Sequence, residues 1–163
     1  MNLKERCARV KLLLLDVDGV LTDGRLYFGP GGEVIKVFHV RDGYGLKLWH
    51  DAGFRSGIIS GRNSDIVSIR ASELGIHFVY QGNDDKLLAL NEIAAEARVL
   101  LDEIAFMGDD LLDIPVLEKV GLAVAVADAP EEVKQASHYV TKIPGGRGAV
   151  REVIDMLLAA KSI

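Results

Sequence analysis

The chain has 163 residues, of which 26% are charged and 49% are hydrophobic, and its formal net charge is −5. This length and composition are typical of a globular protein, so we expect residues 1–163 to form a single domain. The negative charge excludes a nucleic-acid binder, because no basic stretch is present to neutralise phosphate backbones. A small anionic substrate is not excluded, since a local pocket can oppose the overall sign.

A single cysteine, Cys7, excludes a disulfide framework and a cysteine-based zinc site. It favours a reducing, cytoplasmic location. The apolar run at residues 12–15 is far shorter than the ~20 residues that span a membrane. Asp16 and Asp18 follow this run, where a secretory signal would have a cleavage site of small residues. We therefore expect a buried core strand here and no membrane partner.

Strand patterns alternate with helix patterns along the chain. The apolar run at residues 10–16 is typical of a strand buried on both faces of a parallel sheet. Two β-prone pieces flank a breaker of glycine and proline at 29–32, which predicts a β-hairpin insertion at about residues 25–40. Further strands are predicted at residues 54–60, 76–81, 103–110, 122–129 and 138–141. Helices are predicted at residues 42–53, 63–75, 83–99, 111–121, 130–137 and 148–161.

This alternation predicts an α/β fold, in which a doubly wound, Rossmann-like parallel sheet carries helices on both faces. The hairpin is the one exception to the pattern. Asn63 is expected to cap the helix that ends at Gly75, and Pro115 to begin or break the helix at 111–121. The glycine-rich segment 144–150 is expected to be flexible.

Polar clusters fall at the carboxyl ends of four predicted strands, where an open α/β sheet binds its ligands. Parallel strands bring these ends together in space although they are far apart in the sequence. We therefore expect one site built from all four clusters. They are Asp16 and Asp18, then Ser60, Gly61 and Arg62, then Asp84, Asp85 and Lys86, and finally Gly108, Asp109 and Asp110.

Carboxylates gathered at one rim repel each other unless a cation lies among them. Oxygen ligands without Cys or His suit a hard cation, which predicts Mg²⁺ held by Asp16, Asp109 and a backbone carbonyl near Asp18. One carboxylate of the first pair can then attack phosphorus, and the other can transfer protons. Lys86 and Ser60 are expected to hold the phosphoryl oxygens.

These residues carry a resemblance to a known family. The segments DVDGVLTDG (16–24) and GDDLLD (108–113), together with SGR (60–62) and Lys86, resemble the four motifs of the haloacid dehalogenase superfamily of phosphatases. Four further segments extend the resemblance: FHVRDGYGLKLW, YQGNDDK, GDDLLDIPVLEKVGLAVAVADA and GGRGAVREVIDMLL. They are similar to the 3-deoxy-D-manno-octulosonate 8-phosphate phosphatase family across nearly the whole chain. The resemblance implies a Mg²⁺-dependent homotetramer without a large cap domain, acting in lipopolysaccharide precursor synthesis in the cytoplasm.

The resemblance also implies a role for each motif residue. Asp16 is the expected nucleophile and a metal ligand, and Asp18 is the general acid and base whose backbone oxygen also binds the metal. Ser60 and Lys86 are expected to bind the phosphoryl group, and Asp109 to complete the metal site. Asp110 and Asp113 are expected to support this site from behind.

The sugar end of the substrate needs further contacts because no cap domain covers the site. The family resemblance implies substrate contacts from His39, Val40, Arg41, Asp42, Gly43, Lys47, Asp18, Gly61, Arg62 and Arg70. The resemblance implies that some of these come from a neighbouring subunit. The apolar hairpin would be a costly surface to leave in water, so we expect it to associate with the hairpins of other subunits. Arg147 is a further candidate for reaching over a neighbour's site.

Three alternatives remain open at the level of the sequence. The closest is a phosphatase for a nine-carbon sugar acid 9-phosphate, since few side chains distinguish the two sugars. The second is a Mg²⁺-binding receiver-like signalling module, although receivers place adjacent acids after the first strand and take the phosphoryl group after the third. The third is a non-catalytic partner of a nucleotidyl-sugar synthetase, against which the intact Asp16 and Asp18 pair argues.

Overall fold

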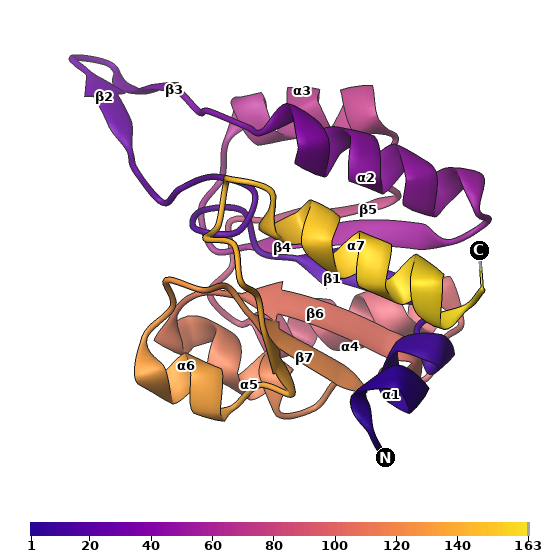
Figure 1. Ribbon diagram of the computed structural model, residues 1–163. Helices are drawn as coiled ribbons and strands as arrows, with labels where there is room; N and C mark the ends of the chain where they lie inside the picture. The colour runs from indigo at the N-terminus through magenta and orange to yellow at the C-terminus, as the bar shows by residue number, and fades with distance from the viewer. Residues whose placement is uncertain (163) are drawn as a thin grey trace.

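The computed structural model describes residues 1–162, and its core is a parallel sheet of six strands in the order β5-β4-β1-β6-β7-β8 (Figure 1). Every neighbouring pair in this sheet is parallel. The predicted doubly wound α/β fold is therefore confirmed. The six strands are β1 (Leu12–Leu15), β4 (Arg55–Ser60), β5 (Phe78–Gln81), β6 (Ile104–Gly108), β7 (Leu122–Ala125) and β8 (Tyr139–Val140).

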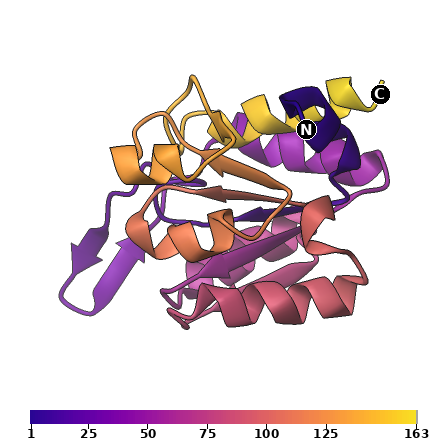
Figure 2. The ribbon, with the colours of Figure 1, turned by 90° about the horizontal axis from the view of Figure 1, so that it is seen from below.

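Helices cover both faces of the sheet, as the alternating pattern predicts. Figure 2 shows α1, α2 and α7 on one side and α4 and α5 on the other. Among the described residues, no helix is both long and apolar enough to cross a membrane. The helices are α1 (Leu3–Arg9), α2 (Val40–Asp51), α3 (Asp65–Leu74), α4 (Lys86–Ala97), α5 (Ile114–Leu117), α6 (Glu131–Gln135) and α7 (Ala149–Ala160), with 3₁₀ turns η1 (Leu101–Glu103) and η2 (Leu111–Asp113).

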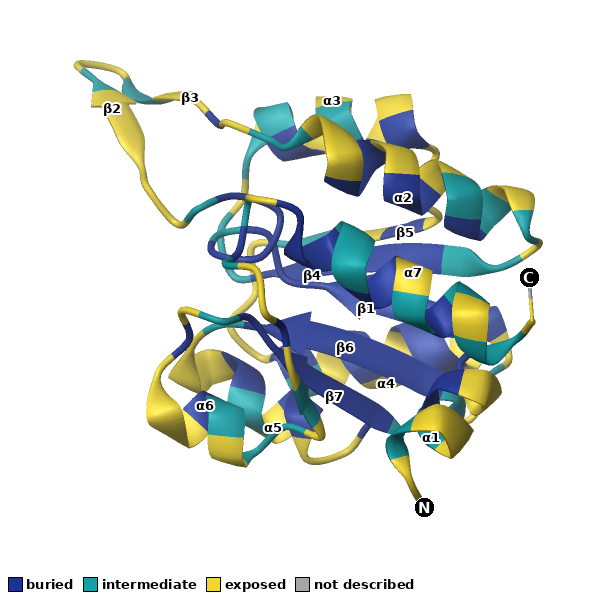
Figure 3. Ribbon diagram, in the orientation of Figure 1, coloured by how far each residue is buried: buried dark blue, intermediate teal, exposed yellow. Residues whose placement is uncertain are grey.

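The centre of the core is β1, whose four leucines are all fully buried. Leu14 lies opposite Gly57 of β4 and Phe106 of β6 in the two ladders that flank it. A Cβ at Gly57 would lie 2.7 Å from the Leu14 side chain, so the small residue makes room for the large one. Figure 3 shows the central strands buried along their length. The loop that follows β1 thus starts from a rigid support.

The hairpin of β2 (Tyr27–Gly29) and β3 (Gly32–Ile35) projects from the body of the protein (Figure 1). It forms a separate antiparallel pair and does not join the central sheet. Its large apolar side chains are exposed, including Phe28 at 62% and Val34 at 56%. The predicted insertion is therefore confirmed, and its apolar side chains stay largely exposed in the single chain, although the Arg62 guanidinium lies over the Phe28 ring.

Two local features differ from the sequence-based expectation. Helix α1 was not anticipated, although Asn2 and Glu5 form a reciprocal capping box, a pattern that marks a helix start. The N-cap of α3 is Ser64 and not Asn63, and its side chain makes no capping hydrogen bond. Pro115 lies in the first turn of α5, where a missing N–H costs nothing, so it begins this helix and does not break it.

Replacing Leu14 by alanine should lower the free energy of unfolding by ~2–5 kcal/mol, because it removes a buried side chain from the central strand and leaves a cavity. Urea denaturation followed by circular dichroism measures this loss. Leu88→Ala on α4 is the matched control, since this leucine is 47% exposed. The control should change the free energy by less than ~0.5 kcal/mol, and equal losses in both variants would contradict the core assignment.

Candidate active site

The site lies at the carboxyl edge of the sheet, where β1, β4 and β6 end next to one another. The segments that follow these strands, together with the start of α4, enclose a cavity of about 180 Å³. All four predicted clusters contribute to it, so the expected convergence is present. The lining residues are Asp16, Asp18, Ser60, Gly61, Arg62, Asp84, Lys86, Asp109, Asp110, Leu112 and Asp113.

Three carboxylates form the acidic centre of this cavity. Asp16, Asp109 and Asp113 each offer an oxygen atom, and these atoms lie within 4.8 Å of one another. Burial, with the Asp113 carboxylate close by, raises the pKa of Asp16 to about 6 although Lys86 opposes the rise. Burial and the Asp16 carboxylate raise the pKa of Asp109 to about 9. Both shifts express the cost of crowding negative charge in a buried place.

Asp113 anchors this centre and is itself fully buried. Its Oδ1 accepts a hydrogen bond from the Lys86 ammonium at 2.6 Å, and its Oδ2 accepts from the backbone N–H groups of Asp109 and Asp110 at 2.9 and 3.1 Å. Both oxygens are therefore occupied by the protein. A Cβ at Gly108 would lie 2.6 Å from the Asp113 Cβ, so only glycine lets the strand end this close. The predicted supporting position of Asp113 matches these contacts.

Lys86 is the buried cation of the site, at the first position of α4. The Asp85 side chain caps this helix by accepting a hydrogen bond from the Leu88 N–H. This cap fixes the start of α4 and so the position of Lys86. Its ammonium lies 3.1 Å from Asp16 Oδ1 and 2.6 Å from Asp113 Oδ1. Burial would lower the pKa of Lys86, but the two carboxylates outweigh burial and raise it. The lysine thus stays charged beside the expected nucleophile.

The donor set fits a divalent metal ion. Asp109 Oδ1 is buried and has no hydrogen-bond partner among the described residues. Because Asp113 is occupied by Lys86 and two N–H groups, Asp16 and Asp109 are the carboxylates left to hold an ion. All candidate donors are oxygens, which suits Mg²⁺. When bound, Mg²⁺ would offset the carboxylate charges and polarise a phosphoryl oxygen.

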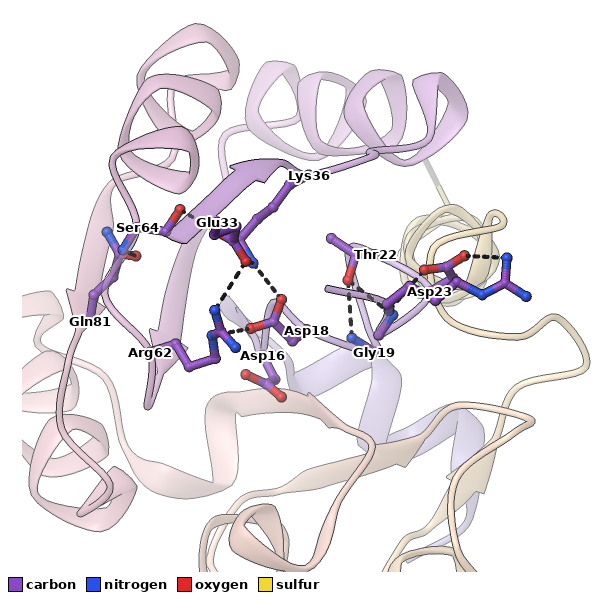
Figure 4. A network of polar contacts seen from close by, with 12 residues as sticks. Asp16, Asp18, Gly19, Thr22, Asp23, Glu33, Lys36, Arg62, Ser64 and Gln81 are labelled. Atoms are coloured by element: carbon purple, nitrogen blue, oxygen red, sulfur yellow. Dashed lines mark hydrogen bonds and ion pairs between the residues drawn. The ribbon is translucent and has the colours of Figure 1, made fainter. Parts of the chain in front are cut away.

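Asp18 faces a different group of side chains from Asp16, although only one residue separates them. Its Oδ1 lies 2.6 Å from the Lys36 ammonium, and its Oδ2 lies 3.6 Å from Arg62 Nε. Figure 4 shows the Asp18 carboxylate between these two cations, with Asp16 on the other side. Asp18 therefore lines the same cavity as Asp16, but its carboxylate is held by cations at the base of the hairpin.

Glu33 joins the same group from strand β3. It accepts from Lys36 at 3.0 Å, from Arg62 at 3.1 Å and from the Ser64 hydroxyl at 3.2 Å. Burial alone would raise the pKa of Glu33, but these hydrogen bonds lower it. Glu33 and Lys36 are not among the site residues predicted from the sequence. The available signal was a pair of opposite charges three residues apart within a strand that otherwise reads as apolar.

The turn after Asp18 depends on glycine. Gly19 has φ of +92°, and a Cβ there would lie 1.8 Å from Asp109 Oδ2. The Thr22 hydroxyl accepts from the N–H groups of Gly19 and Gly24 at 3.2 and 3.1 Å. The close approach of this backbone to Asp109 therefore requires a residue without a side chain.

The glycine-rich segment 144–150, which is expected from the sequence to be flexible, contacts this turn through Gly145 and Gly146. The Gly146 N–H donates to the carbonyl of Val20 at 2.9 Å, and the Gly145 N–H donates to Asp128 at 3.1 Å. A Cβ at Gly145 would lie only 1.7 Å from the carbonyl oxygen of Gly19. Backbone contacts this close fix the segment, while Arg147 itself is exposed.

The cavity of one chain does not include several residues predicted to bind substrate. Its lining, as far as residues 1–162 describe it, lacks residues 39–43, Lys47 and Arg70. His39 caps α2 by accepting from the Arg41 N–H, and Asp42 accepts from the Arg151 N–H at the start of α7. Arg70 pairs with Glu73 and lies over the Phe38 ring. Val40 and Arg70 line a separate cavity of about 430 Å³ together with Lys36.

The fold and the acidic cavity are those of haloacid dehalogenase-like hydrolases, whose family model matches residues 55–154. The 3-deoxy-D-manno-octulosonate 8-phosphate phosphatases KdsC of Yersinia pestis and Escherichia coli K12 are 48% and 47% identical to the chain. Each alignment covers 96% of this chain, with 84% and 83% of the respective relative.

A solved structure gives the same picture. The chain is similar to the crystal structure of 3-deoxy-D-manno-octulosonate 8-phosphate phosphatase from Moraxella catarrhalis in complex with magnesium, phosphate and KDO. The TM-score is 0.95 at 38% identity, over 98% of this chain and 91% of that one. The chain belongs to the 3-deoxy-D-manno-octulosonate 8-phosphate phosphatase family of these hydrolases.

Adding Mg²⁺ should raise the thermal unfolding midpoint, because an ion that binds only the folded state stabilises it by mass action. Asp109→Asn should remove most of this rise, since it removes the charge of a carboxylate whose buried Oδ1 has no hydrogen-bond partner among the described residues. Differential scanning fluorimetry with and without Mg²⁺ measures the effect. Asp51→Asn is the control, because Asp51 is an exposed acid at the end of α2. A rise of equal size in both variants would contradict the metal site.

Without a divalent cation, the free energy of unfolding should fall as the pH rises from about 4 to about 9. The pKa of Asp109 is about 9 in the folded protein and 3.8 ordinarily, so in this window the folded state binds a proton that the unfolded chain has lost. Stability then decreases with pH. Urea denaturation in EDTA at several pH values should show a shallower decline for Asp109→Asn, and an equal slope would contradict the shift.

Proposed function

We propose that the chain hydrolyses 3-deoxy-D-manno-octulosonate 8-phosphate to the free sugar acid and phosphate, with Mg²⁺, in lipopolysaccharide precursor biosynthesis. The observation that carries this proposal is the meeting of Asp16, Lys86 and Asp109 in one cavity at the sheet edge. The similarity to the KdsC proteins supports the choice of substrate. The magnesium, phosphate and KDO of the Moraxella catarrhalis structure support both the cofactor and the sugar acid.

In the first chemical step, a carboxylate oxygen of Asp16 attacks phosphorus. A bond forms between this oxygen and phosphorus, and the bond from phosphorus to the C8 oxygen breaks, which gives an aspartyl phosphate. Asp18 donates a proton to the departing sugar oxygen. The Lys86 ammonium, 3.1 Å from Asp16 Oδ1, is near enough to stabilise the charge on the phosphoryl oxygens.

In the second step, Asp18 takes a proton from water as the water oxygen attacks phosphorus. The bond between phosphorus and Asp16 breaks, which releases phosphate and restores both carboxyl groups. Ser60, Gly61 and Arg62 line the cavity on the side of β4 and would contact the phosphoryl oxygens or the sugar. A Cβ at Gly61 would lie 2.7 Å from Asp84 Oδ1, so a bulkier residue here would crowd the entrance.

We also infer that residues 1–163 form a single domain that acts as a homotetramer in the cytoplasm. The exposed apolar side chains of the hairpin support assembly, because water is a poor solvent for so large an apolar surface. The one cysteine is free and buried, which suits a reducing compartment. Assembly would let residues 39–43, Lys47, Arg70 or Arg147 of one chain complete the sugar-binding site of another.

The purified chain should release phosphate from the octulosonate 8-phosphate faster than from a nine-carbon sugar acid 9-phosphate. A phosphate-release assay over both esters measures kcat/KM for each. EDTA should abolish phosphate release and added Mg²⁺ should restore it. Without the metal ion, nothing offsets the negative charges of Asp16 and Asp109 as the phosphate ester approaches. A higher kcat/KM for the nine-carbon ester would contradict the proposed substrate.

The matched control in this assay is Asp16→Asn, which keeps the size of the side chain but removes the attacking carboxylate. We expect no measurable turnover and an unchanged circular dichroism spectrum. Turnover at the original rate would contradict the covalent route. Phosphorylation of the original chain that persists without release would instead identify a receiver-like module.

A further inference from the structure

Four charged side chains at the base of the hairpin form a closed, neutral network beside the cavity (Figure 4). Lys36 pairs with Asp18 at 2.6 Å and with Glu33 at 3.0 Å. Arg62 pairs with Asp18 at 3.6 Å and with Glu33 at 3.1 Å. Each anion is therefore shared by two cations, and each cation by two anions. A carboxylate shared in this way is restrained in direction.

Lys36 is the most deeply buried member of the network. The exposed fraction of its side chain is 2%, against 21% for Asp18, 11% for Glu33 and 41% for Arg62. Burying an ammonium this far costs free energy unless anions compensate it closely. The carboxylates of Asp18 and Glu33 are the two that do so. Removing Lys36 would release Asp18 from its shortest contact and leave Arg62, more exposed and more distant, as its remaining cation.

Lys36 contacts Asp18 from outside the catalytic cavity. It does not line the cavity that holds Asp16, Lys86 and Asp109, so it does not reach the position of the phosphoryl group. It lines the neighbouring cavity, which the start of α2 and the length of α3 enclose with it. The geometry therefore separates a lysine that binds phosphate, Lys86, from a lysine that holds the proton-transferring carboxylate.

We propose that Lys36 is a positioning residue that holds the carboxylate of Asp18 toward the leaving oxygen, with Glu33 fixing Lys36 and Arg62 in place. The inference rests on the proposed function, because it assigns the leaving-group proton to Asp18. It makes the hairpin a working part of the site, since the residues that orient Asp18 lie on β3 and directly after it. Displacing a reacting group by about 1 Å can cost ~100-fold in rate.

The test is Lys36→Met, which keeps the aliphatic length of the side chain and removes its charge. With octulosonate 8-phosphate we expect kcat to fall roughly 10- to 100-fold while KM stays nearly unchanged. With p-nitrophenyl phosphate the leaving phenolate needs no proton, so the first step should keep its rate. Because Asp18 also activates water in the second step, rapid-mixing experiments should show a burst of p-nitrophenolate that precedes slow turnover.

The controls separate positioning from a general loss of structure. Lys11→Met removes a lysine whose side chain is 60% exposed and pairs with Glu103 at 2.5 Å. Lys11 directly precedes β1, at the opposite end of that strand from the site, so the change should leave kcat and KM unchanged. Lys36→Arg should recover part of the lost kcat, because it restores a cation to Asp18. Glu33→Gln should lower kcat less than Lys36→Met does. Circular dichroism and light scattering establish that each variant is folded and assembled as the original chain is.

Three results would overturn the proposal. A rise in KM with kcat unchanged would make Lys36 a substrate-binding residue. Equal slowing of the first step with both esters would show a general distortion of the site. Unchanged kinetics in Lys36→Met would show that Asp18 needs no such support. Failure of the proposed function looks different: the original chain would then not release phosphate from octulosonate 8-phosphate, and the same variants are compared on the ester that it does hydrolyse.

Discussion

The structure depends on how negative charge is tolerated at one edge of the sheet. Asp16, Asp109 and Asp113 lie within a few ångströms of one another, and Lys86 is the buried cation that faces them. Lys86 contacts Asp16 and Asp113, which leaves Asp109 with a buried oxygen that has no partner among residues 1–162. One buried lysine, Lys86, thus faces three carboxylates and does not neutralise them all. The deficit is what draws a divalent cation and the phosphate that comes with it.

The two acids of the first motif work in separate surroundings. Asp16 faces Lys86 and the acidic centre, whereas Asp18 faces Lys36 and Arg62 at the base of the hairpin. This separation suits two different tasks, attack on phosphorus and transfer of a proton, within three residues of chain. The parallel sheet supplies the first environment and the hairpin supplies the second. In the sequence the hairpin looks like an apolar insertion outside the main fold. In the structure it lies next to the catalytic cavity.

Most of the fold was predictable because its signals are local. Buried runs such as Leu12–Leu15 mark the central strands, and the rule that ligands bind at the carboxyl edge brings Asp16, Ser60, Lys86 and Asp109 together without any coordinates. Helix α1 was not predicted, although Asn2 and Glu5 have the spacing of a capping box in the sequence. The opposite charges of Glu33 and Lys36 are visible in the sequence, but their contacts with Asp18 are not, because these depend on how the hairpin folds back and no periodicity encodes that path.

Protein synthesis proceeds from the N-terminus, and domains generally fold as units while the chain emerges. The turn after Asp18 is made well before Gly145 and Gly146, the residues that contact and brace it. A nascent chain that lacks this brace has every acid of the rim but an unsupported loop between β1 and the hairpin. A translation product that stops before Gly145 would therefore carry the acids of the site without the backbone contacts that hold the turn between them.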